Sequence, residues 1–301
     1  MLDISLVGTG GMMPLPNRFL SSMIIRYKKQ TILIDTGEGT QVSLKILGWG
    51  FKNIDIICLT HFHADHVAGL PGLLHTIANS GKTSPLTIIG PLHLKQVIDS
   101  LLIIARCLPF PIIYKEITVP TTLMFSSINI STLPVDHRTD CIAYCIQTLR
   151  LGKFNIQKAT NIGLPKNYFS LLQNGVSVTH EGKLIHSRDI MGLPRKGFKI
   201  AYCTDTRPVS DLPMFVKEAD IFICEGIYGE DTKLNKAKEY KHMLFSEAAT
   251  IAKKANVKEL WLTHYSPSLT DPSQFLHVAQ NIFSNSHIGY DHKTTTLKYI
   301  N

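Results

Sequence analysis

Short apolar runs alternate along the chain with longer segments of mixed polarity, a pattern typical of an α/β protein. The pattern predicts β-structure at 3–8, 22–27, 31–35, 54–59, 86–89, 123–133, 141–148, 198–203, 220–224, 258–263 and 294–300. It predicts helices at 40–47, 66–79, 92–105, 210–218, 246–254 and within 272–284. The length of 301 residues is enough for one large domain with a substantial core.

The most informative segment follows the predicted strand 54–59. It holds four metal-binding side chains within six residues: His61, His63, Asp65 and His66. Side chains two positions apart on an extended backbone point to the same side, so His61 and His63 are spaced to bind one ion. Asp65 and His66 lie just beyond and can turn towards a second ion. Imidazole and carboxylate together suit a borderline cation such as zinc.

Three further metal-binding residues, His137, Asp205 and His264, each follow a later strand-like run. Ligands at the carboxyl ends of several strands gather along one edge of an open α/β sheet. The combined set is large enough for two ions, and a carboxylate is the natural bridge because each of its oxygens can bind a cation. The predicted assignment gives His61, His63 and His137 to one ion and Asp65, His66 and His264 to the other, with Asp205 between them.

These segments also carry a resemblance to a known family. The chain is similar to the metallo-β-lactamase superfamily, and within it to the RNase Z branch, over nearly its whole length. The matching motifs lie at 7–11, 34–41, 59–66, 134–137, 204–207 and 262–264. The resemblance implies an αββα sandwich, in which two mixed β-sheets are flanked by helices, as a single domain over residues 1–301. It also implies two zinc ions per chain, with manganese or iron as alternatives, and a homodimer.

The resemblance further implies an endoribonuclease that removes 3′ trailers from precursor tRNA and leaves a 3′-hydroxyl. Metal ions lower the pKa of bound water, and the resulting hydroxide attacks the phosphodiester. Asp65 is expected to orient this water or accept its proton while it remains a ligand. The leaving 3′-oxygen needs a proton, and the resemblance assigns its donation to His242, with Glu225 as the partner of that histidine.

The charge of the chain is unevenly distributed. The net charge is +8, and residues 148–200 contain nine lysines and arginines against two acids. Repeated glycines predict an irregular, basic, arm-like insertion at about 149–197 between two strands. The RNase Z branch carries a tRNA-gripping arm in this place, so Lys153, Lys158 and Lys166 are expected to contact RNA phosphates. The alternative is a solvated basic loop that keeps the protein soluble.

Two other functions fit the same ligands. The first is a dinuclear-metal phosphodiesterase acting on small or cyclic nucleotide esters. It is favoured because the arm lacks the Gly-Pro pair usual in RNase Z, and because Lys241 and Met243 replace the residues that usually flank the histidine at 242. The second is a lactonase- or thioesterase-type hydrolase, against which the basic arm and the His242–Glu225 pair count.

Composition agrees with a cytoplasmic enzyme. Hydrophobic residues make up 44% of the chain and charged residues 18%, which is ordinary for a globular protein. No apolar run approaches the ~20 residues needed to span a bilayer, and the N-terminal residues lack the features of a secretory signal, so no membrane partner is expected. Six scattered cysteines without a CxxC pair predict buried free thiols in a reducing compartment.

Overall fold

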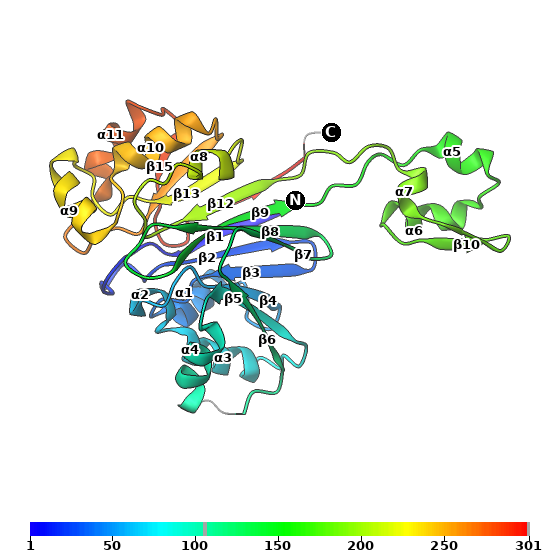
Figure 1. The fold of residues 1–301 in the computed structure, drawn as a ribbon. Coiled ribbons are helices and arrows are strands. Elements are labelled where there is room, and N and C mark those ends of the chain that lie inside the picture. The colour runs from blue at the N-terminus through cyan, green and yellow to red at the C-terminus, as the bar shows by residue number, and fades with distance from the viewer. Residues whose placement is uncertain (105–106, 300–301) are drawn as a thin grey trace. The chain divides into compact units, whose positions relative to one another are not determined.

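The computed structural model describes residues 1–104 and 107–299 of the chain. The chain divides into two compact units. The larger unit comprises Met1–Gln147 and Phe198–Asn301, and the smaller one comprises Thr148–Gly197. The larger unit contains two β-sheets with helices on their outer faces (Figure 1).

The first sheet has seven strands in the order β16-β1-β2-β3-β4-β5-β6. Their bounds are β1 (Leu2–Gly8), β2 (Ser22–Tyr27), β3 (Gln30–Ile34), β4 (Ile54–Cys58), β5 (Leu86–Pro91), β6 (Ile112–Ile117) and β16 (Thr294–Leu297). Strands β3 to β6 run parallel to one another. Parallel neighbours need crossover connections, and helices supply them here. The carboxyl ends of these strands therefore share one edge of the sheet.

The second sheet also has seven strands, in the order β15-β14-β13-β12-β9-β8-β7. Their bounds are β7 (Thr121–Met124), β8 (Ile128–Val135), β9 (Cys141–Thr148), β12 (Lys199–Cys203), β13 (Ile221–Glu225), β14 (Glu259–Thr263) and β15 (Ser286–Ile288). Strands β12 to β15 run parallel, whereas β9 pairs antiparallel with β12. The parallel half again brings the carboxyl ends of its strands to a common edge.

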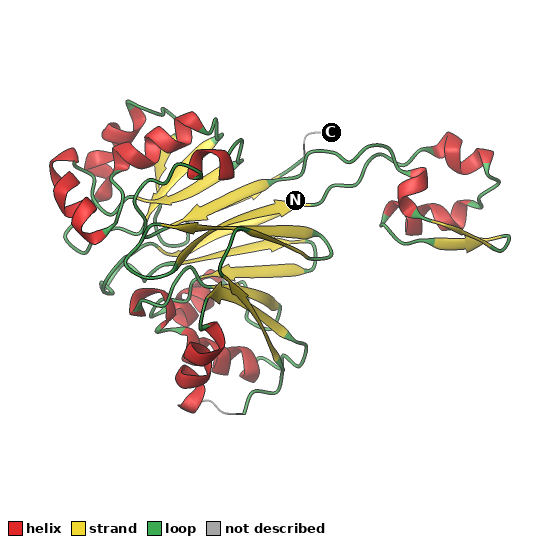
Figure 2. Cartoon of the chain, in the orientation of Figure 1, coloured by secondary structure: helices red, strands yellow, loops and turns green. Residues whose placement is uncertain are grey.

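Apolar side chains from the two sheets pack against each other and form the central core, to which Ile25 and Ile56 of the first sheet and Tyr144 and Trp261 of the second belong. The outer face of the first sheet is covered by α1 (Thr40–Leu47), α3 (Leu70–Asn79) and α4 (Leu94–Leu101). That of the second is covered by α8 (Leu212–Phe215), α10 (Phe245–Lys254) and α11 (Leu276–Gln280). Figure 2 shows this layering, and the predicted αββα sandwich of two mixed sheets is confirmed.

Several predicted elements differ from the observed ones. The helix predicted at 66–79 is two helices, α2 (Ala64–Val67) and α3, because Gly69 packs so closely against the turn at Gly37 that a β-carbon would lie 2.3 Å from its carbonyl oxygen. The β-structure predicted at 123–133 is a hairpin of β7 and β8. Strand β6, strand β15 and helix α9 (Leu234–Tyr240) were not predicted.

Other predicted elements are shorter in the structure. The helix predicted at 92–105 consists of α4 followed by the 3₁₀ turn η1 (Leu102–Ile104), and residue 105 lies outside the described residues. The strand predicted at 294–300 ends at Leu297, and residue 300 also lies outside them. The helix predicted at 210–218 is the single turn α8, and the one within 272–284 is η4 (Pro272–Phe275) followed by α11.

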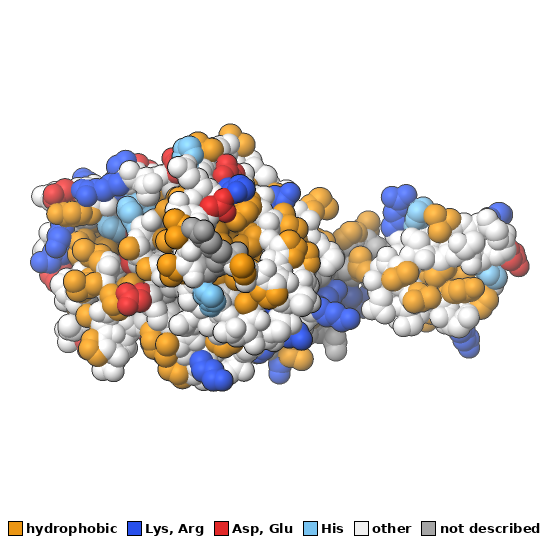
Figure 3. Space-filling view, turned by 90° about the horizontal axis from the view of Figure 1, so that it is seen from below, with side chains coloured by type: hydrophobic (Ala, Val, Ile, Leu, Met, Phe, Trp, Pro, Cys, Tyr) orange, Lys and Arg blue, Asp and Glu red, His pale blue; other side chains and the backbone are white. Residues whose placement is uncertain are grey.

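The repeated glycines predicted an irregular smaller unit, but this unit consists of short helices and strands. Its elements are α5 (Ile156–Asn161), η2 (Lys166–Tyr168), α6 (Phe169–Gln173), β10 (Val178–His180), β11 (Lys183–Ile185) and α7 (Ser187–Ile190). Ala159, Leu164, Leu172, Val178 and Ile190 form a small core of its own, so the glycines end short elements rather than prevent them. In Figure 3 lysine and arginine side chains lie at the edges of this unit, around an apolar area.

Two further features bear on the sequence predictions. Within residues 1–104 and 107–299, no helix has the length and hydropathy needed to cross a membrane. All six cysteines are free, and five are buried as predicted, whereas Cys107 is exposed.

Candidate metal centre

Three of the predicted ligands form a first group at the edge where strands β4 and β8 end. His61 and His63 follow β4, and His137 follows β8. Nε2 of His61 lies 2.9 Å from Nδ1 of His63, and Nε2 of His137 lies 3.3 Å from the same Nδ1. The three rings therefore direct one nitrogen each towards a common point, as the i, i+2 spacing predicted for the first two.

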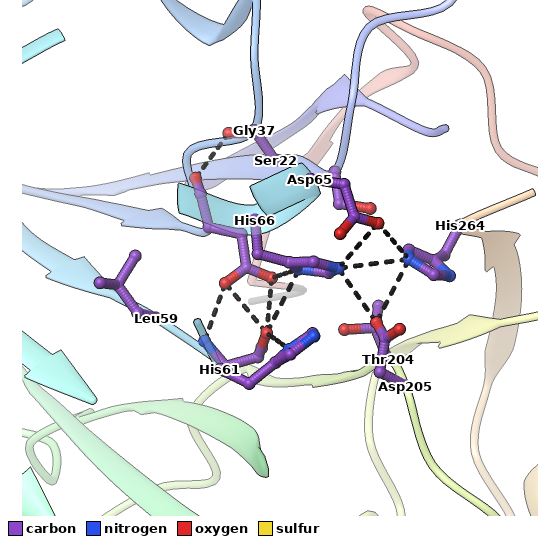
Figure 4. A network of polar contacts seen from close by, with 12 residues as sticks. Ser22, Gly37, Leu59, His61, Asp65, His66, Thr204, Asp205 and His264 are labelled. Atoms are coloured by element: carbon purple, nitrogen blue, oxygen red, sulfur yellow. Dashed lines mark hydrogen bonds and ion pairs between the residues drawn. The ribbon is translucent and has the colours of Figure 1, made fainter. Parts of the chain in front are cut away.

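A second group forms between the short helix α2 and the end of β14. Nε2 of His66 lies 3.2 Å from Nε2 of His264. Oδ2 of Asp65 lies 3.6 Å from the first of these nitrogens and 3.4 Å from the second. Figure 4 shows the three side chains converging, with Asp205 entering from the opposite side.

Asp205, directly after β12, faces both groups. Its Oδ2 lies 3.1 Å from Nε2 of His66 and 3.2 Å from Nε2 of His264. Its Oδ1 lies 3.9 Å from Nε2 of His137. A carboxylate with one oxygen directed to each group has the arrangement that a bridging ligand needs.

The separations between these atoms fit bound cations. Zinc–nitrogen bonds of about 2.0–2.1 Å in a tetrahedral site hold two ligating nitrogens roughly 3.3 Å apart, close to the separations in both histidine groups. Among the described residues, Oδ2 of Asp205 and Nδ1 of His264 are buried without a hydrogen-bond partner. An unsatisfied buried oxygen is costly, and a cation at Asp205 would remove that cost. The donor set therefore fits divalent metal ions.

A buried carboxylate to which the sequence analysis assigned no role supports the second group. Asp35, directly after β3, is fully buried, and its Oδ2 accepts a hydrogen bond of 2.8 Å from Nδ1 of His66. Its Oδ1 accepts a 2.8 Å bond from the backbone N–H of Thr60. The bond to Nδ1 fixes the tautomer of His66 and leaves Nε2 free to bind metal. An acid directly after the apolar run of β3 is the sequence signal that could have identified it.

Several residues of this centre adopt a backbone conformation that is rare outside glycine. Asp35, Asp205 and His264 have φ values of 56°, 54° and 58°. Such residues cost about 1–3 kcal/mol each and persist only where the surroundings hold them. Each lies one or two residues after the end of a strand, so the left-handed turn redirects its side chain from the sheet into the site.

The glycine-containing motif at 7–11 contacts the second group. A β-carbon on Gly11 would lie 2.7 Å from Cε1 of His264, so only glycine lets the chain pass this close to the ring. The backbone N–H of Met12 donates a 2.6 Å hydrogen bond to Oδ2 of Asp65. This segment therefore supports two of the predicted ligands.

The predicted acid pair lies beside the metal ligands. Glu225, at the end of β13, is fully buried, and its Oε2 lies 2.9 Å from Nδ1 of His242. Its Oε1 accepts a 2.5 Å hydrogen bond from the backbone N–H of Thr206. Nδ1 of His242 also lies 3.6 Å from Oδ1 of Asp205. The structure therefore brings both residues to the edge of the site, from segments remote in sequence.

The pKa values of the site histidines shift in both directions. Burial lowers the pKa of His242, but the charge and hydrogen bond of Glu225 outweigh it and raise the pKa to about 9, which favours the protonated ring that a proton donor needs. Burial also lowers the pKa of His66, but the neighbouring Asp205 and Asp35 outweigh it and raise this pKa well above its usual value. At His61, burial and then the neighbouring His66 lower the pKa, which favours the neutral ring that binds metal.

Comparison with known proteins identifies the family of the chain. Residues 16–117 match the model of the metallo-beta-lactamase superfamily. The chain is 50% identical to "Ribonuclease Z" of Clostridium kluyveri over 301 residues, covering 99% of both chains. It is 48% identical to "Ribonuclease Z" of Clostridium acetobutylicum over 308 residues, covering 100% of both. The chain belongs to the ribonuclease Z family.

Solved structures support the fold of this family. The crystal structure of human tRNase Z, short form, aligns with a TM-score of 0.71 at 24% identity and covers 99% of this chain and 100% of the human one. Identity at this level shows a shared fold. The recognition made from the motifs, metallo-β-lactamase superfamily and ribonuclease Z branch, is therefore confirmed.

The three arm lysines belong to the smaller unit. Lys153, Lys158 and Lys166 are exposed there. A cavity of about 700 Å³ within that unit is lined in part by Lys158, Arg188 and apolar groups such as Met191. The role of these lysines stays a prediction.

Proposed function

We propose that this chain is a dinuclear metal-dependent endoribonuclease that removes 3′ trailers from precursor tRNA and leaves a 3′-hydroxyl. The observation that carries the proposal is the hydrogen-bonded His242–Glu225 pair beside the metal ligands. A ribose 3′-oxygen is a poor leaving group that needs a proton, whereas the thiolate expelled from a thioester does not. The curated relatives named Ribonuclease Z, at 48–50% identity over the whole chain, support it.

The proposed assignment gives His61, His63 and His137 to one ion, Asp65, His66 and His264 to the other, and Asp205 to both. When bound, such ions activate water and neutralise charge on a phosphodiester. Asp65 orients the attacking water, held in place by the N–H of Met12. His242 donates its proton to the leaving 3′-oxygen, and Glu225 keeps that ring charged and correctly oriented.

Three finer assignments belong to the same proposal. The ions are zinc, with manganese or iron as alternatives, because nitrogen and oxygen ligands alone do not select among them. The protein acts as a homodimer, which sedimentation of the purified chain would measure directly. It works in the cytoplasm, where a nuclease would meet newly made precursor tRNA.

The smaller unit supplies the grip on RNA in this proposal. Exposed lysines neutralise phosphates and release counterions without reading sequence, which suits a substrate recognised by its shape. All three lysines are exposed: Lys153 precedes α5, Lys158 lies in α5 and Lys166 begins η2. Their spread along one segment suits the backbone of an extended RNA helix better than a small nucleotide ester.

A cleavage assay on precursor tRNA tests the proposal. Zinc-loaded protein is incubated with a precursor tRNA carrying a 3′ trailer, and the Asp65→Ala variant is run beside it. A single cut at the trailer junction that leaves a 3′-hydroxyl, absent with the variant, is the expected result. Metal-loaded protein that leaves the RNA intact yet hydrolyses a small diester would overturn the proposal in favour of a small-molecule phosphodiesterase.

A further inference from the structure

We infer that Arg207 is the residue that positions the proton donor, by fixing the short connection that carries His242. This inference rests on the proposed function, because it assumes that His242 protonates the leaving oxygen. Arg207 lies two residues after Asp205, in a segment that leaves the second sheet at the end of β12. Its side chain donates a hydrogen bond to the main-chain carbonyl of His242.

The contacts of the guanidinium join two parts of the chain around His242. Its Nη1 donates to the carbonyl oxygen of His242 and, at 2.9 Å, to Oε2 of Glu247, while Nη2 donates to Oε1 of Glu247. The side chains of Arg207 and Glu247 are only 16% and 20% exposed. A two-pronged arginine–carboxylate pair with this little exposure holds both geometry and charge far better than a surface ion pair.

Glu247 closes the other side of the connection. It lies in the first turn of α10, and its Oε2 also accepts a 3.0 Å hydrogen bond from the backbone N–H of Leu244. The guanidinium therefore holds the carbonyl of His242 directly and the N–H of Leu244 through Glu247. Lys241, before His242, has a φ of 56°, so the connection needs such outside bonds to keep its conformation.

The same segment fixes the donor relative to the metal ligands. The backbone N–H of Arg207 donates a 3.0 Å hydrogen bond to the carbonyl of Asp136, next to His137. The backbone N–H of Thr206 donates to Glu225, the partner of His242. Three consecutive residues therefore have separate roles: Asp205 is a predicted ligand, Thr206 contacts Glu225, and Arg207 holds His242. Displacement of the arginine would move the donor while leaving the ligands in place.

The consequence is a selective defect. An RNA phosphodiester expels a ribose oxygen that needs a proton, whereas bis(4-nitrophenyl) phosphate expels a stable phenolate that does not. Arg207→Lys keeps the charge but cannot contact the carbonyl and both carboxylate oxygens together. We expect this variant to lose about 10²-fold in kcat on precursor tRNA, with KM unchanged, because a donor displaced by about 1 Å costs that much. Turnover of the nitrophenyl ester should stay within about threefold of wild type.

A double-mutant cycle with His242→Ala separates positioning from general weakening of the fold. If Arg207 acts through His242, its replacement has no further effect on precursor tRNA cleavage once the imidazole is gone. Ile251→Val, on the buried face of α10, is the control for looser packing of this helix and should change both activities in equal proportion.

Failure of this inference and failure of the proposed function give different experimental results. Wild-type protein that fails to cut precursor tRNA would remove the proposed function, whatever Arg207 does. With wild-type cleavage established, an equal loss on both substrates, or a full additional loss in the His242→Ala background, would overturn the inference. A loss confined to precursor tRNA and absent in that background supports it. Thermal unfolding of each variant shows whether the protein compared is folded.

Discussion

Replacing Gly11 by alanine tests the assignment of His264 as a metal ligand by adding a single methyl group. The new β-carbon would lie 2.7 Å from Cε1 and 2.8 Å from Nε2 of the ring, whereas ordinary contact begins at 3.4 Å. The turn cannot easily withdraw, because Gly11 donates to the carbonyl of Tyr265 and the next residue donates to Asp65. The ring must therefore move by about 0.7 Å. Metal–ligand distances tolerate only about 0.2 Å, so Nε2 would leave bonding range.

We expect Gly11→Ala to keep the ion of His61, His63 and His137 and to lose affinity for the other. Loss of a contact outside the ligands already costs about 10–100-fold in metal affinity, and displacement of a ligand should cost at least as much. Metal content per chain is measured across a series of chelator concentrations, and cleavage of precursor tRNA is measured on the same samples. Activity should follow occupancy of the second ion.

The neighbouring glycine offers a matched control. A β-carbon on Gly10 would lie 3.2 Å from the carbonyl oxygen of Phe19 and 3.4 Å from the side chain of Arg18, and it would not reach His264. Gly10→Ala should therefore retain both ions. Wild-type metal content and activity in Gly11→Ala would refute the reasoning, since a ring displaced by the added methyl cannot remain a ligand.

Three other predictions test separate parts of the molecule. Asp35→Asn removes the charge that fixes the tautomer of His66 and should lower metal affinity about 10–100-fold by chelator titration; unchanged affinity would contradict that role. Removal of metal should lower the melting temperature, because free metal at 100 times its Kd adds about 2.7 kcal/mol to the free energy of unfolding. A melting temperature that does not change with metal would contradict binding to the folded chain. A triple replacement of Lys153, Lys158 and Lys166 should weaken tRNA binding and make its affinity less dependent on salt, by about 0.9 in the log–log slope per lost phosphate contact. Hydrolysis of a small diester should be unchanged. Equal loss of activity on both substrates would indicate that the arm has only a structural role.

The fold was largely predictable because its strands are short apolar runs in which nearly every residue is buried. Strands β4, β12 and β14 were found within one residue of their observed bounds. The errors have local causes. Strand β6, at the edge of its sheet, consists mostly of exposed and half-buried residues, with polar side chains at Lys115 and Glu116, and therefore lacks a long apolar run. The elements of the smaller unit are three to six residues long, too short for their periodicity to stand out among the glycines.

The candidate site was predictable to the extent that its residues directly follow strands. Asp205 and His264 could be proposed together because the carboxyl ends of the parallel strands β12 and β14 meet at one edge. The prediction of a single sheet edge was incomplete, because His61 follows β4 of the other sheet. Asp35 and Arg207 were not assigned roles. Their partners, His66 and His242, lie 31 and 35 residues further along the chain, and the hydrogen bonds between them depend on how two loops pack. The positive φ of Asp35 is likewise not apparent from the sequence, because the residue type alone does not fix the backbone conformation.

The donors of the metal centre come from both sheets, and this arrangement links metal binding to the packing of the core. His61 and His66 follow β4 of the first sheet, whereas Asp205 and His264 follow β12 and β14 of the second. Asp205 has a buried carboxylate oxygen without a hydrogen bond, and Nε2 of His66 from one sheet faces Nε2 of His264 from the other. Ions bound there would tie the two sheet edges together, as a crosslink would. Their binding would then offset part of the conformational cost of the left-handed turns at Asp205 and His264.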